Sequence, residues 1–220
     1  MNLLFIRHAE SFKSIEDRHG GLGLPLTEQG RIDVIELVSF LKHSESFDFD
    51  NSLFFCSDLT QVIETAKIIE EETHVLFNIV ADLKNISLGI LDGLSTEEAK
   101  RKYPDVAENL EKWRNGKIKI NDFIIPQAET MQDFYSRIFN FINSIITKEK
   151  NVIIIGTRSV GVAITNIFRN YSSQMNKDNY QRYLFDPSSI SKYSFENGKT
   201  NIDYINKTDF LKTKANHPDS

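Results

Sequence analysis

The run Val152-Ile153-Ile154-Ile155, followed by Gly156-Thr157-Arg158-Ser159, decides the fold. Four consecutive β-branched residues are typical of a strand that is buried on both faces. A second run of this kind, Asn2-Leu3-Leu4-Phe5-Ile6, lies near the start of the chain. Such strands occur in parallel sheets that helices cover on both sides. The two runs therefore predict the centre of a parallel sheet.

Helical patterns alternate with these runs and with two further candidate strands, Leu53-Phe54-Phe55-Cys56 and residues 75–80. The alternation predicts an α/β fold, a three-layer α/β/α sandwich with a mainly parallel sheet. Two apolar segments, 189–195 and 201–205, flank Glu196-Asn197-Gly198-Lys199 and predict a hairpin at an antiparallel edge. The expected helices begin at a Thr27 cap, at an Asp58 cap, at a capping box over 95–98, at about Asp105, at Glu129 and at about Ser159.

We expect one domain over residues 1–206, because no linker, repeat or low-complexity segment interrupts it. Residues 7–26 are rich in glycine and predict a long loop. Residues 83–128 resemble an insertion placed over the sheet like a lid. Residues 207–220 are polar and predict a loose C-terminal tail.

Composition excludes several classes of protein. The chain has 26 Lys plus Arg against 31 Asp plus Glu, and no long basic run, which argues against nucleic acid as a partner. Cys56 is the only cysteine, so no internal disulfide forms and no CxxC site exists. No apolar stretch is long enough to span a membrane, and no signal peptide precedes the first strand. We expect a cytoplasmic protein without a metal or cofactor, and a homodimer remains open.

Polar segments follow the predicted strands at the points where the strands end. Arg7 and His8 come directly after the first strand, and Thr157 and Arg158 come directly after the isoleucine-rich strand. The carboxyl ends of parallel strands meet at one edge of a sheet, where such folds place their sites. A guanidinium binds phosphate through a fork of donors, and a neutral imidazole can attack phosphorus. These residues predict a phosphate site with a histidine nucleophile.

The chain resembles the histidine phosphatase superfamily, which includes the phosphoglycerate mutases. The stretch Arg7-His8-Ala9-Glu10-Ser11 is similar to the R-H-G-E-[ST] motif of that family. Further matches follow in the same order along nearly the whole chain: 24–30, 56–59 with 64–66, 88–95, Pro126 with Glu129 and Arg137, and the hairpin 188–206. The resemblance implies the same sandwich fold and a metal-independent phosphatase that works through a phosphohistidine on His8.

Three positions depart from the pattern that the resemblance implies. The family has a second arginine where this chain has Gln61, an acid where it has Asn85, and a second histidine where it has Thr157. The loss of a positioned general acid costs about 10² to 10⁴ in rate. These residues remain neutral hydrogen-bond partners for phosphate oxygens. The departures leave open a second function, a catalytically degenerate module that binds a phosphate or nucleotide.

Other residues can compensate for the lost charges. Arg158 can restore positive charge, and Arg18 and His19 lie where the family often binds substrate. Glu10 or Asp92 can serve as the proton donor. Each has a simpler explanation as well, since Arg158 can face solvent at a helix start and His19 can satisfy a loop backbone. We expect an atypical phosphatase or phosphotransferase that acts on a small phosphorylated metabolite.

Overall fold

A computed structural model describes residues 1–43, 48–119, 124–148, 150–176, 178 and 180–212. These residues contain a six-stranded sheet with the order β3-β2-β4-β1-β5-β6. The first four strands run parallel, β5 is antiparallel to β1, and β6 is antiparallel to β5. The α/β class and the mainly parallel sheet with an antiparallel edge are confirmed. The strands are β1 (Asn2–Arg7), β2 (Ser52–Cys56), β3 (Asn78–Ile79), β4 (Asn151–Gly156), β5 (Ile190–Glu196) and β6 (Lys199–Lys207).

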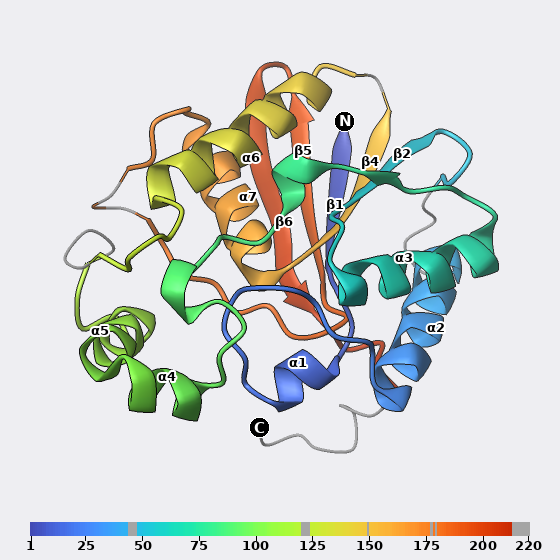
Figure 1. Cartoon of the computed structure of the whole chain (residues 1–220). Coiled ribbons are helices and arrows are strands. Elements are labelled where there is room, and N and C mark those ends of the chain that lie inside the picture. The colour runs from blue at the N-terminus through green and yellow to red at the C-terminus, as the bar shows by residue number, and fades with distance from the viewer. Residues whose placement is uncertain (44–47, 120–123, 149, 177, 179, 213–220) are drawn as a thin grey trace.

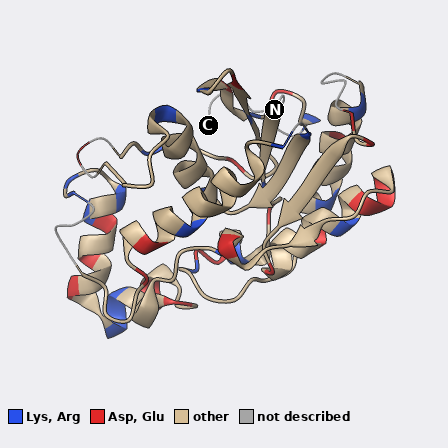
Figure 2. Ribbon diagram, turned by 90° about the horizontal axis from the view of Figure 1, so that it is seen from above, with Lys and Arg blue, Asp and Glu red and all other residues tan. Residues whose placement is uncertain are grey.

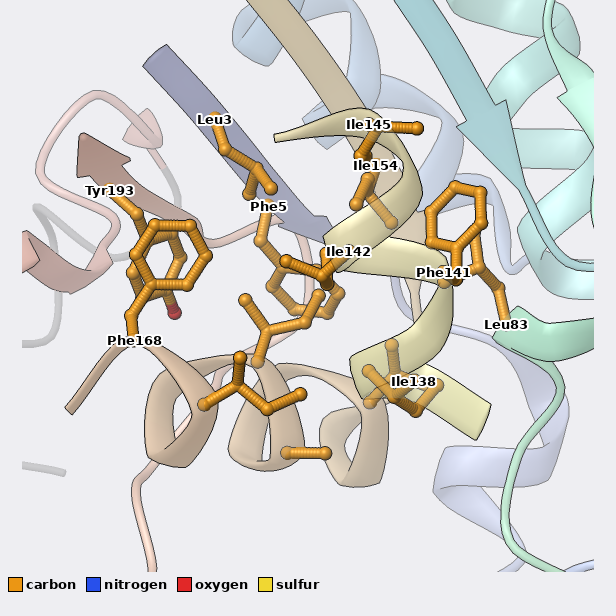
Figure 3. Packing of buried hydrophobic residues seen from close by; sticks show 14 of the residues in the cluster. Leu3, Phe5, Leu83, Ile138, Phe141, Ile142, Ile145, Ile154, Phe168 and Tyr193 are labelled. Atoms are coloured by element: carbon orange, nitrogen blue, oxygen red, sulfur yellow. The ribbon is translucent and has the colours of Figure 1, made fainter. Parts of the chain in front are cut away.

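Helices cover both faces of the sheet (Figure 1). On one face, α6 (Met131–Ile145) and α7 (Arg158–Asn170) pack in a cluster with Phe5 and Ile154, part of which Figure 3 shows. On the other face, α2 (Glu28–His43) and α3 (Thr60–Thr73) pack with Leu4 and Ile153. Successive residues of β1 thus enter opposite cores. Figure 2 shows that charged residues gather on the helices and connecting segments rather than on the central strands.

The segment predicted as an insertion, residues 83–128, has a small hydrophobic cluster of its own. A 3₁₀ turn, η1 (Ala81–Leu83), leads into it, and it contains a second such turn, η2 (Gly89–Leu91), and two helices, α4 (Thr96–Lys102) and α5 (Pro104–Arg114). Leu91, Ala99 and Leu110 are at the centre of this cluster. The segment after β1 is bonded to the insertion, because the His19 amide donates to the Leu94 carbonyl at 2.8 Å and the His19 carbonyl accepts from the Gly93 amide at 2.9 Å.

The structure corrects several predicted boundaries. Asp58 does not cap α3, since Leu59 occupies the N-cap position and contributes no side-chain hydrogen bond. The third strand is only two residues long, Asn78–Ile79, instead of 75–80. The expected loop over 7–26 contains a short helix, α1 (Phe12–Ile15). The Thr27 cap and the capping box at Ser95 are confirmed.

The C-terminal segment packs on the domain further along the chain than its polarity suggests, as far as Leu211. Phe210 stacks on Phe40 with ring centroids 4.6 Å apart, and Leu211 is buried. Phe210 thereby packs against the hydrophobic cluster that α2 and α3 form with the sheet. The remainder of the expected tail, 213–220, lies outside the described residues, as does part of the expected insertion, 120–123.

Candidate functional site

Strand pairing brings the ends of β1 and β4 to the same level. Arg7 pairs with Gly156, and the His8 amide donates to the Gly156 carbonyl at 3.0 Å. His8 therefore lies beside Thr157. Because β2 also pairs with β4, the turn that follows β2 reaches the same edge. The antiparallel strand β5 begins there, so the turn that precedes it joins the site.

His8 is a buried, neutral imidazole. Its Nδ1 lies 2.8 Å from the Ala9 carbonyl oxygen. A carbonyl oxygen only accepts, so the proton is on Nδ1 and the lone pair is on Nε2. Burial, followed by the positive charge of Arg7, lowers the pKa of His8 from 6.5 to about 3. Nε2 makes no hydrogen bond among the described residues, which leaves it free to act as a nucleophile.

Arg7 supplies a buried positive charge next to this imidazole. Its Nη1 donates to the Phe185 carbonyl at 2.5 Å, and its side chain is largely buried. Burial, followed by the charge of Arg158, lowers the pKa of Arg7 to about 10, so the guanidinium is still positive at neutral pH. Its Nε has no hydrogen-bond partner among the described residues. A buried donor in this state is costly, and an anion at this edge would satisfy it.

Several other buried polar atoms near this edge have no hydrogen-bond partner among the described residues: Ser57 Oγ, Gln61 Oε1, Ser188 Oγ and Ser189 Oγ. Ser57 lies in the turn after β2, Gln61 in the first turn of α3, and Ser188 and Ser189 in the turn before β5. The backbone of Ser188 is in the left-handed region, with φ of 59°, and its amide donates to the His8 carbonyl at 3.4 Å. Backbone strain of this kind often accompanies a functional site. Gln61 thus lies at the edge where the sequence placed it.

Asn85 and Thr157 form a neutral network with Ser159. The Thr157 hydroxyl donates to Asn85 Oδ1 at 3.1 Å, and the Ser159 hydroxyl donates to the same oxygen. Thr157 occupies the N-cap position of α7 but its side chain makes no capping hydrogen bond. The first amides of a helix attract anions. The start of α7 therefore adds to the positive potential beside His8.

Arg158 is exposed at the first position of α7, and it makes no hydrogen bond or ion pair among the described residues. Its charge nevertheless lowers the pKa of Arg7, of His8 and of Arg114. Arg158 thus lies close enough to the Arg7–His8 pair to act on it electrostatically, while its exposure also fits the alternative of an arginine that faces solvent at a helix start.

Arg18 and His19 are engaged with the insertion. Arg18 Nε pairs with Glu16 at 2.5 Å, and its Nη1 reaches Glu98 at 3.4 Å. His19 Nδ1 lies 3.2 Å from Arg114 Nη2, and burial followed by the Arg114 charge lowers the pKa of His19. His19 is thus a buried link between the loop after β1 and the end of α5; among the described residues its ring contacts the side chains of Arg114 and Thr96 and not, as the simpler explanation had it, the loop backbone.

The two predicted proton donors have different surroundings. Glu10 Oε1 accepts from the Thr27 hydroxyl at 2.8 Å, which ties it to the start of α2. Asp92 Oδ2 accepts from the Ser87 hydroxyl at 2.7 Å, and Asp92 Oδ1 accepts from the Leu88 amide at 2.8 Å. The negative charge of Asp92 also acts on a buried lysine, Lys13.

Sequence reasoning missed Lys13 and Arg114. Lys13 is on α1, within the segment predicted as a loop, and its side chain is 8% exposed. Arg114 ends α5 and reaches His19 from a distance of 95 residues along the chain. No local pattern marks either residue. Ser188 and Ser189 had a usable signal, because the start of an antiparallel strand lies at the carboxyl edge of its parallel neighbours.

Within the described part of the chain, no group of three or more His, Cys, Asp or Glu side chains is arranged to hold a metal ion. None of the helices described there has the length and the apolar character that a membrane span requires. The arrangement places positive charge and unpaired polar atoms around a neutral histidine.

Two curated relatives illustrate the similarity in sequence. The chain is 33% identical over 120 residues to a 2,3-bisphosphoglycerate-dependent phosphoglycerate mutase of Neisseria meningitidis, a match that covers 52% of this chain and 50% of the mutase. It thus spans about half the length of that relative. It is 23% identical over 166 residues to an uncharacterised phosphatase, PhoE, of Bacillus subtilis, covering 74% of this chain and 75% of that protein.

Solved structures share the fold at low identity. Bacillus stearothermophilus YhfR superposes with a TM-score of 0.80 at 19% identity, over 96% of this chain and 99% of that one. A putative α-ribazole-5'-phosphate phosphatase of Escherichia coli gives a TM-score of 0.76 at 21% identity, over 94% and 96% of the two chains. A mycobacterial glucosyl-3-phosphoglycerate phosphatase, solved with VO3, gives 0.76 at 17% identity, over 94% and 99%.

The sequence model of the histidine phosphatase superfamily (branch 1) matches residues 3–208, nearly the whole described chain. The order of motifs, the strand order and the position of His8 at the end of β1 agree with this match. The chain belongs to the histidine phosphatase superfamily.

Proposed function

We propose that this chain is an atypical phosphatase or phosphotransferase that acts on a small phosphomonoester through a phosphohistidine at His8. The observation that carries the proposal is the neutral imidazole, whose Nδ1 is anchored to the Ala9 carbonyl and whose Nε2 is free. In the first step Nε2 forms a bond to phosphorus while the bond from phosphorus to the ester oxygen breaks. Water then hydrolyses the phosphohistidine, or an acceptor alcohol takes the phosphoryl group.

The positive groups around His8 support the charge on the phosphoryl oxygens. Arg7 is buried next to the imidazole, and Arg158 is close enough to lower the pKa of both. Phosphoryl transfer depends chiefly on positioning and on such electrostatic stabilisation. Ser57, Ser188, Ser189 and Gln61 offer further polar contacts from the same edge. The relatives and neighbours that are named as phosphatases or mutases act on phosphate esters, which supports a small phosphorylated substrate for this chain.

The proton donor for the leaving oxygen is the weakest part of this site. Glu10 is held at the start of α2 by Thr27, whereas Asp92 acts electrostatically on Lys13, a neighbour of His8. We therefore propose Asp92 as the donor. Because the Asp92 carboxylate already accepts hydrogen bonds from the Ser87 hydroxyl and the Leu88 amide, it is poorly placed to serve a leaving oxygen as well, and we expect slow turnover.

Trapping of the intermediate tests the proposal. The protein is incubated with radiolabelled or activated phosphomonoesters, quenched in base, and assayed for acid-labile phosphate on histidine. We expect a phosphohistidine and hydrolysis in the wild type and in His43→Ala, an exposed histidine on α2, and neither in His8→Ala. Hydrolysis that survives in His8→Ala, or no phosphohistidine with any ester of a broad panel, would overturn the proposal.

The second candidate function is a module that binds a phosphorylated molecule without turnover. The observation that favours it is the neutral network of Asn85, Thr157 and Ser159, together with the neutral Gln61. Binding of phosphate or vanadate that raises the melting temperature of the protein, with no hydrolysis and no phosphohistidine, is the result that distinguishes this function from the first.

A further inference from the structure

Lys13 is a buried lysine that the proposed mechanism does not yet use. Its side chain is 8% exposed, although lysine is almost never buried without partners. The ammonium group has three donors, and the described residues offer it a single acceptor, the Gly21 carbonyl, at 3.4 Å. This bond is long, so most of the hydrogen-bonding capacity of the ammonium is unused. The remaining donors are available to an anion that enters the site.

The ammonium lies within electrostatic reach of the nucleophile. Its charge is one of the causes that lower the pKa of His8. Burial lowers the pKa of Lys13 itself, and the opposing effect comes from Asp92, whose negative charge favours the protonated lysine. Since Asp92 is held by the Ser87 hydroxyl and the Leu88 amide, it provides a fixed counter-charge on one side of Lys13.

One glycine-rich segment touches both Lys13 and Gln61. The Gly21 carbonyl accepts from Lys13 Nζ, and Gly23 packs so closely on Gln61 that a Cβ there would lie 2.0 Å from Oε1. Gly20, with φ of +27°, lies against Asp92, where a Cβ would lie 1.6 Å from Oδ1. The segment thus places a positive side chain, a neutral amide and a carboxylate along one stretch of backbone. Lys13 and Gln61 are the two hydrogen-bond donors that contact this segment, and only Lys13 carries a positive charge.

We propose that Lys13 is a phosphate ligand of this site, which binds an oxygen of the phosphoryl group that His8 receives and supplies the positive charge that Gln61 does not. The inference rests on the proposed function, because it needs an anion at His8. It adds a third cation to the site, contributed by α1, to Arg7 at the end of β1 and Arg158 on α7. The alternative is a lysine that only holds the 20–23 segment in place, and such a lysine has no effect on anion affinity once the fold is intact.

The test measures anion affinity directly. Orthovanadate and inorganic phosphate are titrated into wild type, Lys13→Gln and Lys67→Gln by calorimetry; Lys67 is an exposed lysine on α3. Loss of one charge-assisted hydrogen bond weakens affinity by about 10- to 100-fold. We expect this loss in Lys13→Gln and none in Lys67→Gln. We also expect Lys13→Gln/Gln61→Arg to regain most of the affinity, since position 61 faces the same backbone segment.

Each outcome bears on a different claim. If Lys13→Gln binds vanadate as tightly as wild type while His8→Ala still abolishes the phosphohistidine, the role of Lys13 is wrong and the proposed function stands. If wild type binds neither anion and forms no phosphohistidine, both are wrong. Thermal melts check that each variant is folded. Should Lys13→Gln fail to fold, Lys13→Met, which keeps the aliphatic stem, enters the same comparison, and wild-type affinity in that variant overturns the inference.

Discussion

The two halves of the site differ in how completely their polar groups are paired. On the β1 side, Arg7 is positively charged and its Nε has no partner within the described chain, and Nε2 of the neutral His8 is free. On the β4 side, Asn85 accepts from both Thr157 and Ser159, and all three groups are neutral. The first half has an unpaired donor that an anion would satisfy, whereas the three neutral groups satisfy one another. Under the proposed function, the positive charge that binds a phosphate therefore comes from Arg7 and from Arg158, at the start of α7, while the neutral network contributes shape.

The largest effect is expected from Arg7→Met. The change removes the buried cation next to His8, and loss of one donor of this kind costs about 10² to 10³ in rate. Hydrolysis and vanadate affinity should both fall, while Arg101→Met, an exposed arginine of α4, should change neither. Equal losses in the two variants would mean that overall charge rather than the Arg7 position matters, and the contrast between the halves would disappear.

Acid should destabilise the β1 half selectively. The pKa of His8 is about 3 in the folded protein, below its ordinary value of 6.5, because burial and Arg7 disfavour the imidazolium. Between pH 6.5 and 3 the unfolded chain binds a proton at His8 that the folded chain does not. The stability that this group contributes is present above pH 6.5 and is lost as pH falls toward 3, by about 1.4 kcal/mol for each pH unit.

Urea unfolding between pH 7 and pH 4 measures this effect. We expect the free energy of unfolding of His8→Asn to fall less steeply with pH than that of wild type, because asparagine does not titrate. Parallel curves for the two proteins would show that His8 is protonated normally in the folded state. The neutral nucleophile required by the proposed mechanism would then be absent at mildly acidic pH.

Asn85→Ala should disrupt the neutral hydrogen-bond network on the β4 side and leave the charge of the site unchanged. Two hydroxyl donors lose their common acceptor, and an unsatisfied buried group costs about 1 to 3 kcal/mol. Asn85→Asp keeps the acceptor and should cost less. The free energy of unfolding is compared with that of Asn201→Ala, an exposed asparagine of β6. A large loss of vanadate affinity in Asn85→Ala, with little loss of stability, would contradict the division of roles between the halves.

The smallest effect is expected from Arg18→Ala. Its guanidinium is already paired with Glu16 and Glu98 and donates to the Gly93 carbonyl at 3.0 Å. Exposed pairs of this kind contribute less than about 1 kcal/mol. Vanadate affinity should change by less than about twofold, since a tenfold change in affinity needs about 1.4 kcal/mol. A tenfold loss would bring Arg18 into the anion site and restore the role that the sequence suggested for it.

The sequence predicts this fold well where burial alone decides the structure. The runs around Phe5 and Ile154 require burial on both faces, and the position of Arg7 and His8 at a strand end follows directly. The sequence does not predict features of the site that depend on tertiary contacts. Lys13 is buried because α1 folds against the 20–23 segment, and Arg114 reaches His19 only through the packing of α5. Nothing in the composition of either segment encodes these distances.

The neutral network is a second feature that the sequence predicts only in part. The sequence identifies Asn85 and Thr157 as departures from the family pattern, but it does not indicate that they bond to each other. That bond depends on the turn after β3 lying beside the start of α7. The Asp58 cap was likewise wrong because the chain turns one residue later, at Leu59, and local propensity does not fix such boundaries.

The alternation of β1 between two cores has a consequence for variation in this protein. Leu3 and Phe5 pack in the cluster formed with α6 and α7, and Leu4 and Ile6 pack in the cluster formed with α2 and α3. Two independent sets of apolar side chains therefore determine the position of the imidazole at the end of this strand. A substitution in either core, far from the site, can therefore move the His8 ring by about a few tenths of an ångström. Differences in turnover among natural variants can then arise from residues that do not contact the substrate.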